Sequence, residues 1–163
     1  MCNGNIGVKV WGMGMDNIKE LIRDLDWSKP EEVQKKSIEQ LLKMHDSELI
    51  FLAQQNELCH KYCWHNAAAV LKAIGYPRIR PVIPYLMEWF QDINWPGVVT
   101  IVETLRTINP NELIPYIEEA SKRSIDENDD CWAFGLVTLI RELDLTPIVN
   151  KDIYNELIRL SNY

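Results

Sequence analysis

Apolar residues recur every three or four positions along most of this chain, which is the spacing that puts them on one face of an α-helix. The clearest case begins after residue 15, where Ile18, Leu21, Ile22 and Leu25 share such a face. Polar stretches, glycines and prolines interrupt the pattern and divide it into eight or nine helical segments. No segment is convincing as part of a sheet. We therefore expect an all-α fold.

Three helix starts are predicted from side chains that accept hydrogen bonds from the free N–H groups of a first helical turn. Ser28 stands three residues before Glu31, which is the spacing of a capping box. Asn94 is expected to cap a helix that has Pro96 in its first turn. Asn109 is expected to cap the following helix.

Two further signals concern helix ends. Gly75 follows an apolar segment that begins near Trp64, and glycine readily adopts the left-handed conformation that closes a helix. The acidic loop 126–130 is expected to cap a helix that starts at Cys131 and to add solubility. Residues 98–102 are all β-branched and so favour a strand. We predict a helix there because the flanking caps and the repeat described below agree on one.

The N-terminal segment differs from the rest. Residues 1–15 contain four of the seven glycines, a composition that disfavours a stable helix. We expect residues 1–15 to form a loose arm and residues 16–163 to form a single helical-repeat domain. A compact chain of this length can bury roughly 68–70% of the surface that it exposes when unfolded, so no disulfide or metal is needed for a core.

The helical segments repeat along the chain. Placing Trp64 on Trp95, an offset of 31 residues, also places Ile83-Pro84-Tyr85 on Ile114-Pro115-Tyr116. An earlier pair fits at an offset of 33, and a later pair begins at Trp132, 37 residues after Trp95. Helical pairs at such a period bury their apolar faces by stacking on their neighbours. The repeat predicts a short right-handed α-α superhelix of about four helical pairs.

The segment from Leu86 to Pro96 contains Glu88-Trp89, Gln91-Asp92 and Asn94-Trp95-Pro96. With Gly75-Tyr76-Pro77-Arg78 before it and Asn128-Asp129 to Trp132 after it, this segment resembles a family of small bacterial HEAT-like domains of unknown function. The resemblance covers roughly residues 16–145. It implies an ARM/HEAT-type fold and brings no activity. One departure is that Pro84 and Pro115 lie in the second helix of each pair, whereas typical HEAT repeats place proline in the first.

The charge balance argues against a nucleic-acid partner. The chain has 17 Lys and Arg against 24 Asp and Glu, so its formal net charge is 17 − 24 = −7. Phosphate backbones are repelled on average by such a chain, and the one dense basic group, Lys35-Lys36, lies beside acidic residues. There is also no apolar run of about 18 residues, so we expect no membrane span. The cysteines show no regular framework, which indicates reduced thiols and a cytoplasmic protein.

The strongest local concentration of metal-ligand residue types lies between residues 59 and 65. Cys59 and Cys63 are four residues apart, so a helix would present both thiols on one face, and His60 and His65 would add nitrogen ligands for zinc. A structural zinc site, however, usually has two well-separated ligand pairs. A packed pair of reduced thiols explains the same residues without a metal. We therefore expect no cofactor and keep the four residues as metal candidates.

The tryptophans and the central turn supply the candidate binding residues. An aromatic ridge can hold a peptide or ligand because tryptophan is enriched at binding hot spots. Packing between repeats equally explains why a tryptophan recurs near the start of the first helix of each pair, since each Trp would lie over the preceding pair. The candidate binding residues are Trp64, Trp89, Asp92, Asn94, Trp95 and Trp132.

These observations favour a non-enzymatic protein–protein interaction module. Repeat folds expose extended surfaces, and an acidic surface complements a basic partner. A specific version is an immunity or antitoxin-like protein that neutralises a basic toxin or nuclease. The alternative is a metal-dependent hydrolase or a small-molecule-binding protein that uses the Cys59–His65 cluster. A third class, nucleic-acid binding, would require a basic groove that the sequence does not show.

Overall fold

The computed structural model describes residues 14–162, and all regular structure in this range is helical. This confirms the all-α prediction for the described residues. The α-helices are α1 (Met15–Arg23), α2 (Glu31–Leu41), α3 (Ile50–Ala53), α4 (Trp64–Ile74), α5 (Ile83–Glu88), α6 (Val98–Leu105), α7 (Pro110–Asp126), α8 (Asp130–Glu142) and α9 (Lys151–Ser161). Three 3-10 helices join them: η1 (Asp46–Glu48), η2 (Arg80–Val82) and η3 (Trp89–Gln91).

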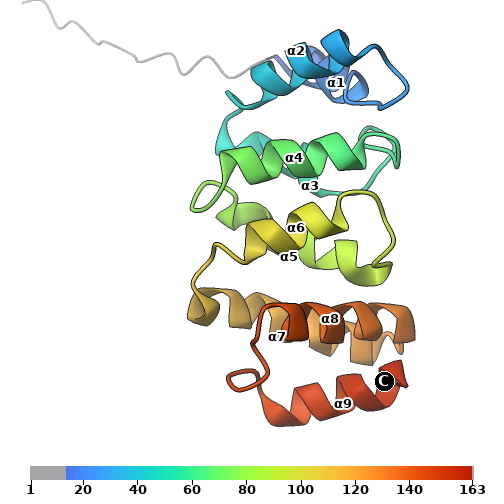
Figure 1. The fold of residues 1–163 in the computed structure, drawn as a ribbon, viewed down its shortest axis with the longest axis vertical. Coiled ribbons are helices and arrows are strands. Elements are labelled where there is room, and N and C mark those ends of the chain that lie inside the picture. Colours follow the sequence, from blue (N-terminus) through green and yellow to red (C-terminus); the bar gives the residue numbers. More distant parts are fainter. Residues whose placement is uncertain (1–13, 163) are drawn as a thin grey trace, which may run out of the picture.

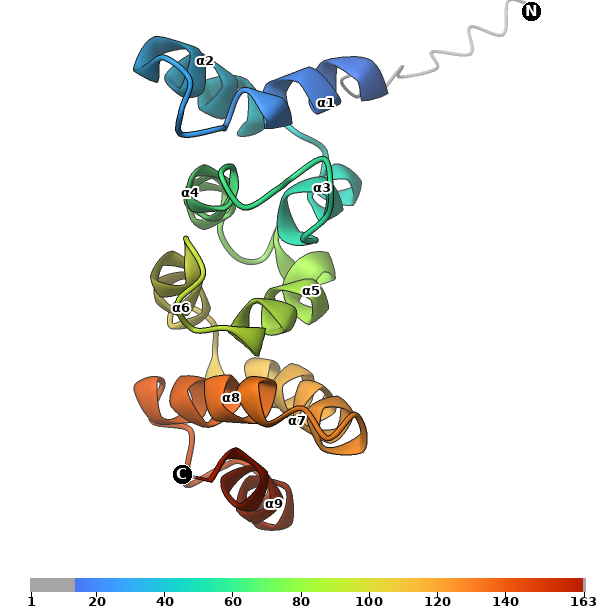
Figure 2. The same ribbon diagram turned by 90° about the vertical axis from the view of Figure 1, so that its right-hand side faces the viewer.

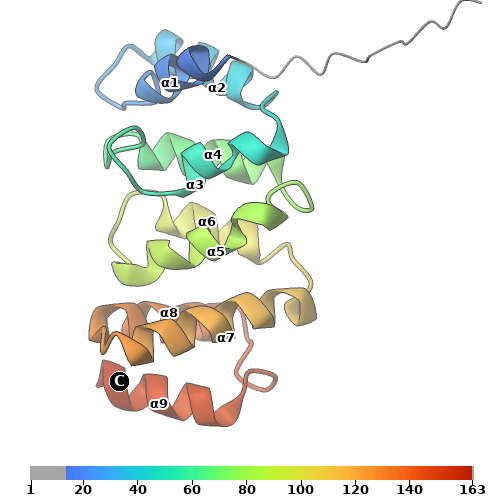
Figure 3. The ribbon, with the colours of Figure 1, turned by 180° about the vertical axis from the view of Figure 1, so that it is seen from behind.

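The helices lie across the long axis of the molecule and are stacked in layers that follow one another in chain order, from α1 and α2 at one end to α9 at the other (Figure 1). Turned by 90°, the molecule shows α4, α6 and α8 along one side and α3, α5 and α7 along the other (Figure 2). The view from behind shows the second side (Figure 3). Helix α4 packs on α6, α5 packs on α7, and α8 packs on α7 and α9.

The core runs through the middle of this stack. The predicted apolar face of α1 is buried, with Ile18, Leu21, Ile22 and Leu25 between 0% and 6% exposed. Each such side chain contributes about 1.5–3 kcal/mol when it leaves water. No helix among residues 14–162 is long and apolar enough to cross a lipid bilayer.

Two buried tryptophans connect layers that are distant in sequence. The Trp89 indole Nε1 donates a hydrogen bond of 2.7 Å to the carbonyl oxygen of Ala53, and Trp132 Nε1 donates one of 3.0 Å to the carbonyl oxygen of Met87. Both side chains are 0% exposed. The indole N–H is a polar group that must be paired when buried, so each hydrogen bond fixes where one layer sits on the previous one.

Polar contacts between layers join residues at the spacing of the sequence repeat. Lys72 Nζ lies 2.6 Å from Glu103 Oε2, 31 positions away, and Arg78 Nε lies 2.7 Å from Asp46 Oδ1, 32 positions away. The Tyr76 hydroxyl donates to a Glu112 carboxylate 36 positions away. The first separation equals the offset of 31 residues found in the sequence, and the other two lie one residue below the offsets of 33 and 37.

Several predicted helix ends are confirmed. The Asn109 side chain accepts a hydrogen bond from the backbone N–H of Asn111 at the start of α7. Asp129 accepts one from the N–H of Trp132 at the start of α8. Gly75 follows α4 with a φ of 69°, in the region that favours glycine. Residues 98–102 are helical despite their β-branched side chains.

The prediction of a capping box at Ser28 is wrong. Helix α2 begins at Glu31, its N-cap residue is Pro30, and no side chain caps it. The reason is a local competitor: Asp26 Oδ1 accepts hydrogen bonds from both the backbone N–H and the hydroxyl of Ser28, at 2.8 and 2.6 Å. These bonds hold Ser28 in a turn before the helix.

The cap at Asn94 is also wrong, because α6 begins only at Val98. The Asp92 carboxylate accepts from the backbone N–H of Asn94 at 2.8 Å, so the two residues form a turn. Gly97 precedes α6 with a φ of 93°, and a Cβ there would lie 2.9 Å from Ala68 Cβ. A glycine is therefore required where α6 approaches α4.

The predicted arm also changes, since Met15 already belongs to α1, and residues 1–13 lie outside the described residues.

Gly135 is a second position where close packing requires glycine. It lies in the middle of α8, and a Cβ there would overlap the carbonyl oxygen of Phe90. We predict that Gly135→Ala lowers the free energy of unfolding by about 1–3 kcal/mol, although alanine favours helix by about 1 kcal/mol at an unobstructed site. Urea unfolding followed by circular dichroism measures the change.

Thr138→Ala, one turn later in α8, is the control for helix propensity. It adds no atom toward Phe90 and is expected to change the free energy of unfolding by less than about 1 kcal/mol. A Gly135→Ala protein as stable as the wild type would show that α8 and η3 are not in close contact.

Candidate functional site

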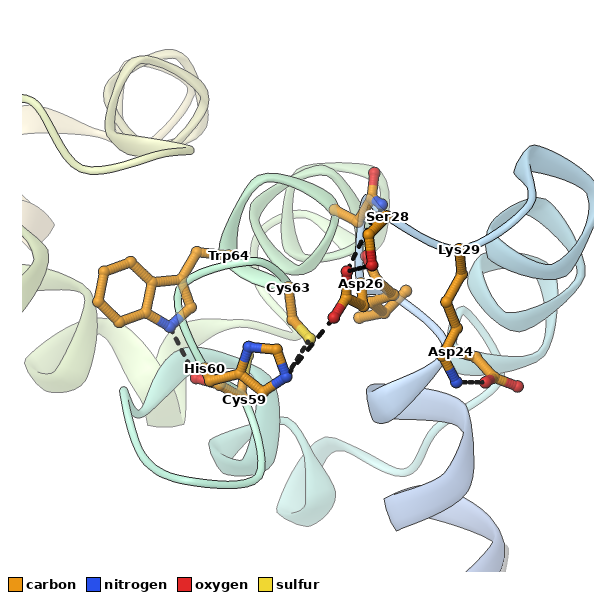
Figure 4. Close-up of polar contacts among 10 residues, drawn as sticks. Asp24, Asp26, Ser28, Lys29, Cys59, His60, Cys63 and Trp64 are labelled. Carbon is orange, nitrogen blue, oxygen red and sulfur yellow. Dashed lines mark hydrogen bonds and ion pairs between the residues drawn. The ribbon is translucent and has the colours of Figure 1, made fainter.

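The Cys59–His65 segment lies in the loop before α4, beside the turn that follows α1. Cys59 and Cys63 are 0% exposed. Cys63 Sγ lies 3.8 Å from His60 Nε2, and the same nitrogen lies 3.8 Å from Asp26 Oδ2 (Figure 4). His65 is exposed at the start of α4. The structure therefore brings Cys63, His60 and Asp26 together. The sequence spacing did not predict the contact between His60 and Asp26.

This arrangement does not provide a nucleophile. A catalytic histidine uses one ring nitrogen to take the proton of the nucleophile and the other to contact its orienting carboxylate. Here both contacts involve Nε2. Burial raises the pKa of the Cys59 thiol to about 12 and, together with the nearby charge of Asp26, raises the pKa of the Cys63 thiol to about 11. Both thiols are therefore protonated at neutral pH, and a protonated thiol is a poor nucleophile.

The potential metal ligands of the segment are not grouped in the structure. Within residues 14–162, the group of three or more potential ligand atoms lying within 4.8 Å of one another is Asp129, Asp130 and Cys131. Cys59, His60, Cys63 and His65 form no such group among the described residues. The metal-dependent alternative stays a prediction without a set of assembled ligands.

The candidate tryptophans lie mainly in the core. Trp64 is half-buried, with its ring centroid 5.0 Å from that of Trp95 and 6.0 Å from that of Trp89. Trp89 and Trp132 are fully buried. By contrast, Trp27 in the turn between α1 and α2 is 61% exposed. The four candidate tryptophans thus lie where packing between layers requires them, and they form no continuous ridge on the surface. They are Trp64, Trp89, Trp95 and Trp132.

Asp92 and Asn94, the remaining candidates, line an open pocket of about 470 Å³ that we call the acidic pocket. It lies between the 91–94 turn and the first residues of α8. Its lining includes Gln91, Asp92, Asn94, Asp130, Cys131 and Phe134, and no Lys or Arg is among the described residues that line it. Two side chains separated by 38 positions, Asp92 and Asp130, therefore meet at one pocket.

The carboxylates around the acidic pocket are held by backbone groups. Asp92 Oδ1 accepts from the backbone N–H and side-chain amide of Asn94, at 2.8 and 3.1 Å. Asp129 accepts from the N–H of Trp132 at 2.9 Å, and Asp130 begins α8. The positive end of the α8 dipole stabilises negative charge at Asp129 and Asp130.

The pKa of the Cys131 thiol reflects the negative charge of this region. The charge of Asp130 and a hydrogen bond to its carboxylate raise the pKa of the Cys131 thiol, and the charges of Asp129 and Asp92 act in the same direction. A thiolate at this point would be repelled by all three carboxylates. The negative charges around Cys131 therefore disfavour its thiolate form.

A family model described as a domain of unknown function (DUF5071) matches residues 60–163. The chain belongs to this family. No curated protein and no solved structure matches the sequence. The DUF5071 match includes α4 to α9 and the whole acidic pocket, and it begins in the loop that carries His60.

The layer formed by α1 and α2 lies outside the DUF5071 match but continues the stack. Asn66 Nδ2 in α4 donates to the carbonyl oxygen of Leu25 and to Gln34 Oε1, both at 2.7 Å. The backbone N–H of Trp27 donates to the carbonyl oxygen of Tyr62 at 3.1 Å. The N-terminal helices are thus fixed to the DUF5071 region by hydrogen bonds to its first layer.

The contribution of the acidic loop to a pocket was missed from the sequence, which assigned that loop to capping and solubility. The repeat did contain a signal. Asp92 and Asp129 are 37 residues apart, the same offset that relates Trp95 to Trp132. Equivalent positions in successive stacked units lie side by side, so the two acidic segments could have been placed together.

The buried thiols predict a pH dependence of stability. The raised pKa of Cys59 means that its neutral form is favoured by folding, so this stabilisation is complete below its unfolded value of 9.0 and is lost as pH rises toward 12. As pH rises from 8 to 10.5, the wild type should lose about 2 kcal/mol of unfolding free energy because of this thiol.

Denaturant unfolding of wild type and Cys59→Ala at both pH values tests this. Alkaline titration of Tyr and Lys affects both proteins, so the readout is the difference between their two pH-dependent losses. We expect the variant to lose about 2 kcal/mol less than the wild type. Equal losses would show that Cys59 is not buried as a neutral thiol.

Proposed function

We propose that this protein is a non-enzymatic protein-interaction module that binds a basic protein through the acidic pocket. The observation that carries the proposal is that Asp92 and Asp130 line one open pocket, with Asp129 close to its Cys131, and that no Lys or Arg is among the described residues that line it. The net charge of −7 adds a favourable field around this site. An immunity or antitoxin-like protein that neutralises a basic toxin or nuclease is the specific form of this proposal.

The dimensions and chemistry of the pocket suit a cationic side chain. Its volume of about 470 Å³ lies in the range of small-ligand sites, which is ample for one Lys or Arg side chain. Asp92 and Asp130 both line it and present carboxylate acceptors. Arginine binds carboxylates through a planar fork of N–H donors, and complementary charge raises association rates and excludes acidic partners.

The absence of catalytic geometry in the Cys59–His65 segment supports a binding role. Its two thiols are buried and protonated, and His60 contacts Cys63 and Asp26 through one nitrogen. Free thiols at Cys59, Cys63 and Cys131 are also consistent with a cytoplasmic location, where thiols stay reduced.

The finer fold assignment is part of the same proposal. We assign the stack to a short right-handed α-α superhelix of the ARM/HEAT type, with about four helical pairs. Layers in chain order and polar contacts between residues 31 to 36 positions apart support this assignment. Such folds commonly bind proteins because stacking leaves an extended surface.

The test removes the pocket charges while keeping its hydrogen bonds. Asp92→Asn and Asp130→Asn together retain an Oδ1 acceptor at both positions, so the 91–94 turn is preserved. The matched control, Glu20→Gln with Glu39→Gln, removes the same charge from exposed positions of α1 and α2. Tagged wild-type, pocket-variant and control proteins are used as baits in lysate of the native host, followed by calorimetry with the purified partner.

We expect one basic partner that is captured by the wild type and the control, and that binds the pocket variant at least about tenfold more weakly, which corresponds to about 1.4 kcal/mol. The difference should shrink as salt rises because screening weakens exposed charge pairs. A partner held equally by all three proteins would contradict the proposal.

A further inference from the structure

An apolar groove adjoins the acidic pocket. The groove has a volume of about 290 Å³ and lies between α6 and α8. Its lining is mostly apolar and consists of Phe90, Ile93, Val98, Val99, Val102 and Leu139, with Thr138 and Glu142. We call it the α6–α8 groove. Ile93 lines both this groove and the acidic pocket, so the two form one continuous surface with an acidic end and an apolar end.

The groove follows from how the layers pack. Helix α8 packs chiefly on η3, α7 and α9, and α6 packs chiefly on α4. Gly135 brings the backbone of α8 against the carbonyl of Phe90, so α8 packs on η3 of the preceding layer, while α6 and α8 remain neighbours on one side of the molecule (Figure 2). Val98, Val99 and Val102 of α6 and Leu139 of α8 then line the groove between these two helices.

Val99 is the most accessible apolar residue at this surface, with 72% of its side chain exposed. Single exposed apolar residues are ordinary on protein surfaces. Val99, however, lines a groove whose other walls are mostly apolar, and it lies within one connected surface with Asp92 and Asp130. An apolar groove beside a charged pocket is a common arrangement for binding an amphipathic segment.

The charge around the groove is asymmetric. At one end it joins the acidic pocket, where Asp92 and Asp130 line the surface. At its rim Glu142 Oε2 lies 3.6 Å from Arg106 Nη2, so this carboxylate is already compensated. The uncompensated negative charge is therefore concentrated at the pocket end, and the positive charge of an occupant should lie there.

We propose that the α6–α8 groove and the acidic pocket together bind a short cationic, amphipathic segment of the basic partner, with an apolar side chain in the groove and a Lys or Arg in the pocket. This inference rests on the proposed function and specifies the chemistry of the partner. Charge complementarity selects this occupant, because a second copy of this acidic chain would bring like charges together.

The test uses the full chain, labelled with ¹⁵N, and three synthetic peptides of 14 residues. The first alternates Lys and Leu at helical amphipathic spacing, the second replaces each Lys with Glu, and the third replaces each Leu with Ser. Titrations followed by amide chemical shifts give both the affinity and the location. We expect the Lys/Leu peptide to shift amides in residues 90–102 and 130–142, and to bind at least fivefold more tightly than the Lys/Ser peptide.

Two variants separate the groove from the pocket. Val99→Gln removes apolar surface at an exposed helical position without adding charge, and we expect it to weaken binding of the Lys/Leu peptide at least fivefold while leaving the Lys/Ser peptide unaffected. Ile148→Gln removes a similar exposed apolar side chain from the loop before α9 and should leave both affinities unchanged. Asp92→Asn with Asp130→Asn should weaken both cationic peptides.

The outcomes distinguish the two proposals. Equal affinity for the Lys/Leu and Lys/Ser peptides, no binding of either, or shifts confined to other helices would overturn the inference about the groove. Sensitivity to Asp92 and Asp130 without sensitivity to Val99 would overturn the groove and keep the proposed function. Binding of the Glu/Leu peptide as strong as that of the Lys/Leu peptide would contradict both proposals.

Discussion

Burial of an indole ring between layers is the interaction on which most of this structure depends. Trp89 and Trp132 each fill the space between successive layers and donate their one hydrogen bond to a backbone carbonyl of the preceding layer. Apolar burial supplies the stability, but it is non-directional and would allow layers to slide. A buried N–H without its acceptor costs about 1–3 kcal/mol, so the hydrogen bond fixes the position of each layer.

The same constraint builds the candidate site. The hydrogen bond from Trp132 Nε1 to the Met87 carbonyl oxygen fixes the position of α8. It places the first turn of α8 beside the turn that follows η3. Asp92 and Asp130 then lie on one pocket although 38 positions separate them. Gly135 allows the close approach of α8 to Phe90, and this approach leaves the α6–α8 groove open on the neighbouring side. Pocket and groove are therefore consequences of how α8 sits on the layer before it.

Much of the fold was predictable from the sequence because helical faces and caps are local properties. The buried face of α1 and the caps at Asn109 and Asp129 were expected. The failures at Ser28 and Asn94 have one cause: an aspartate two residues earlier accepts the N–H of each residue and holds it in a turn. A capping motif predicts a helix start only where no nearer side chain competes for the same groups.

The site was less predictable because its chemistry depends on burial and on contacts between layers. The spacing of Cys59 and Cys63 is the same whether the thiols are exposed or buried, and only their burial makes them neutral and unreactive. Asp92 and Asn94 were recognised from the central turn, whereas Asp130 was assigned to a solubilising loop.

Structural roles account for some of these acidic residues but not for their arrangement. Asp129 caps α8, and Asp92 shapes the turn before α6, so each would be favoured on its own. Neither role requires Asp92 to line the same pocket as Asp130, or the charges of Asp92 and Asp129 to add to that of Asp130 in raising the pKa of Cys131. Convergence of like charges destabilises a free protein and is relieved when a cation binds. This is why the acidic pocket, rather than the more reactive residue types between Cys59 and His65, is the part of the molecule that we connect with function.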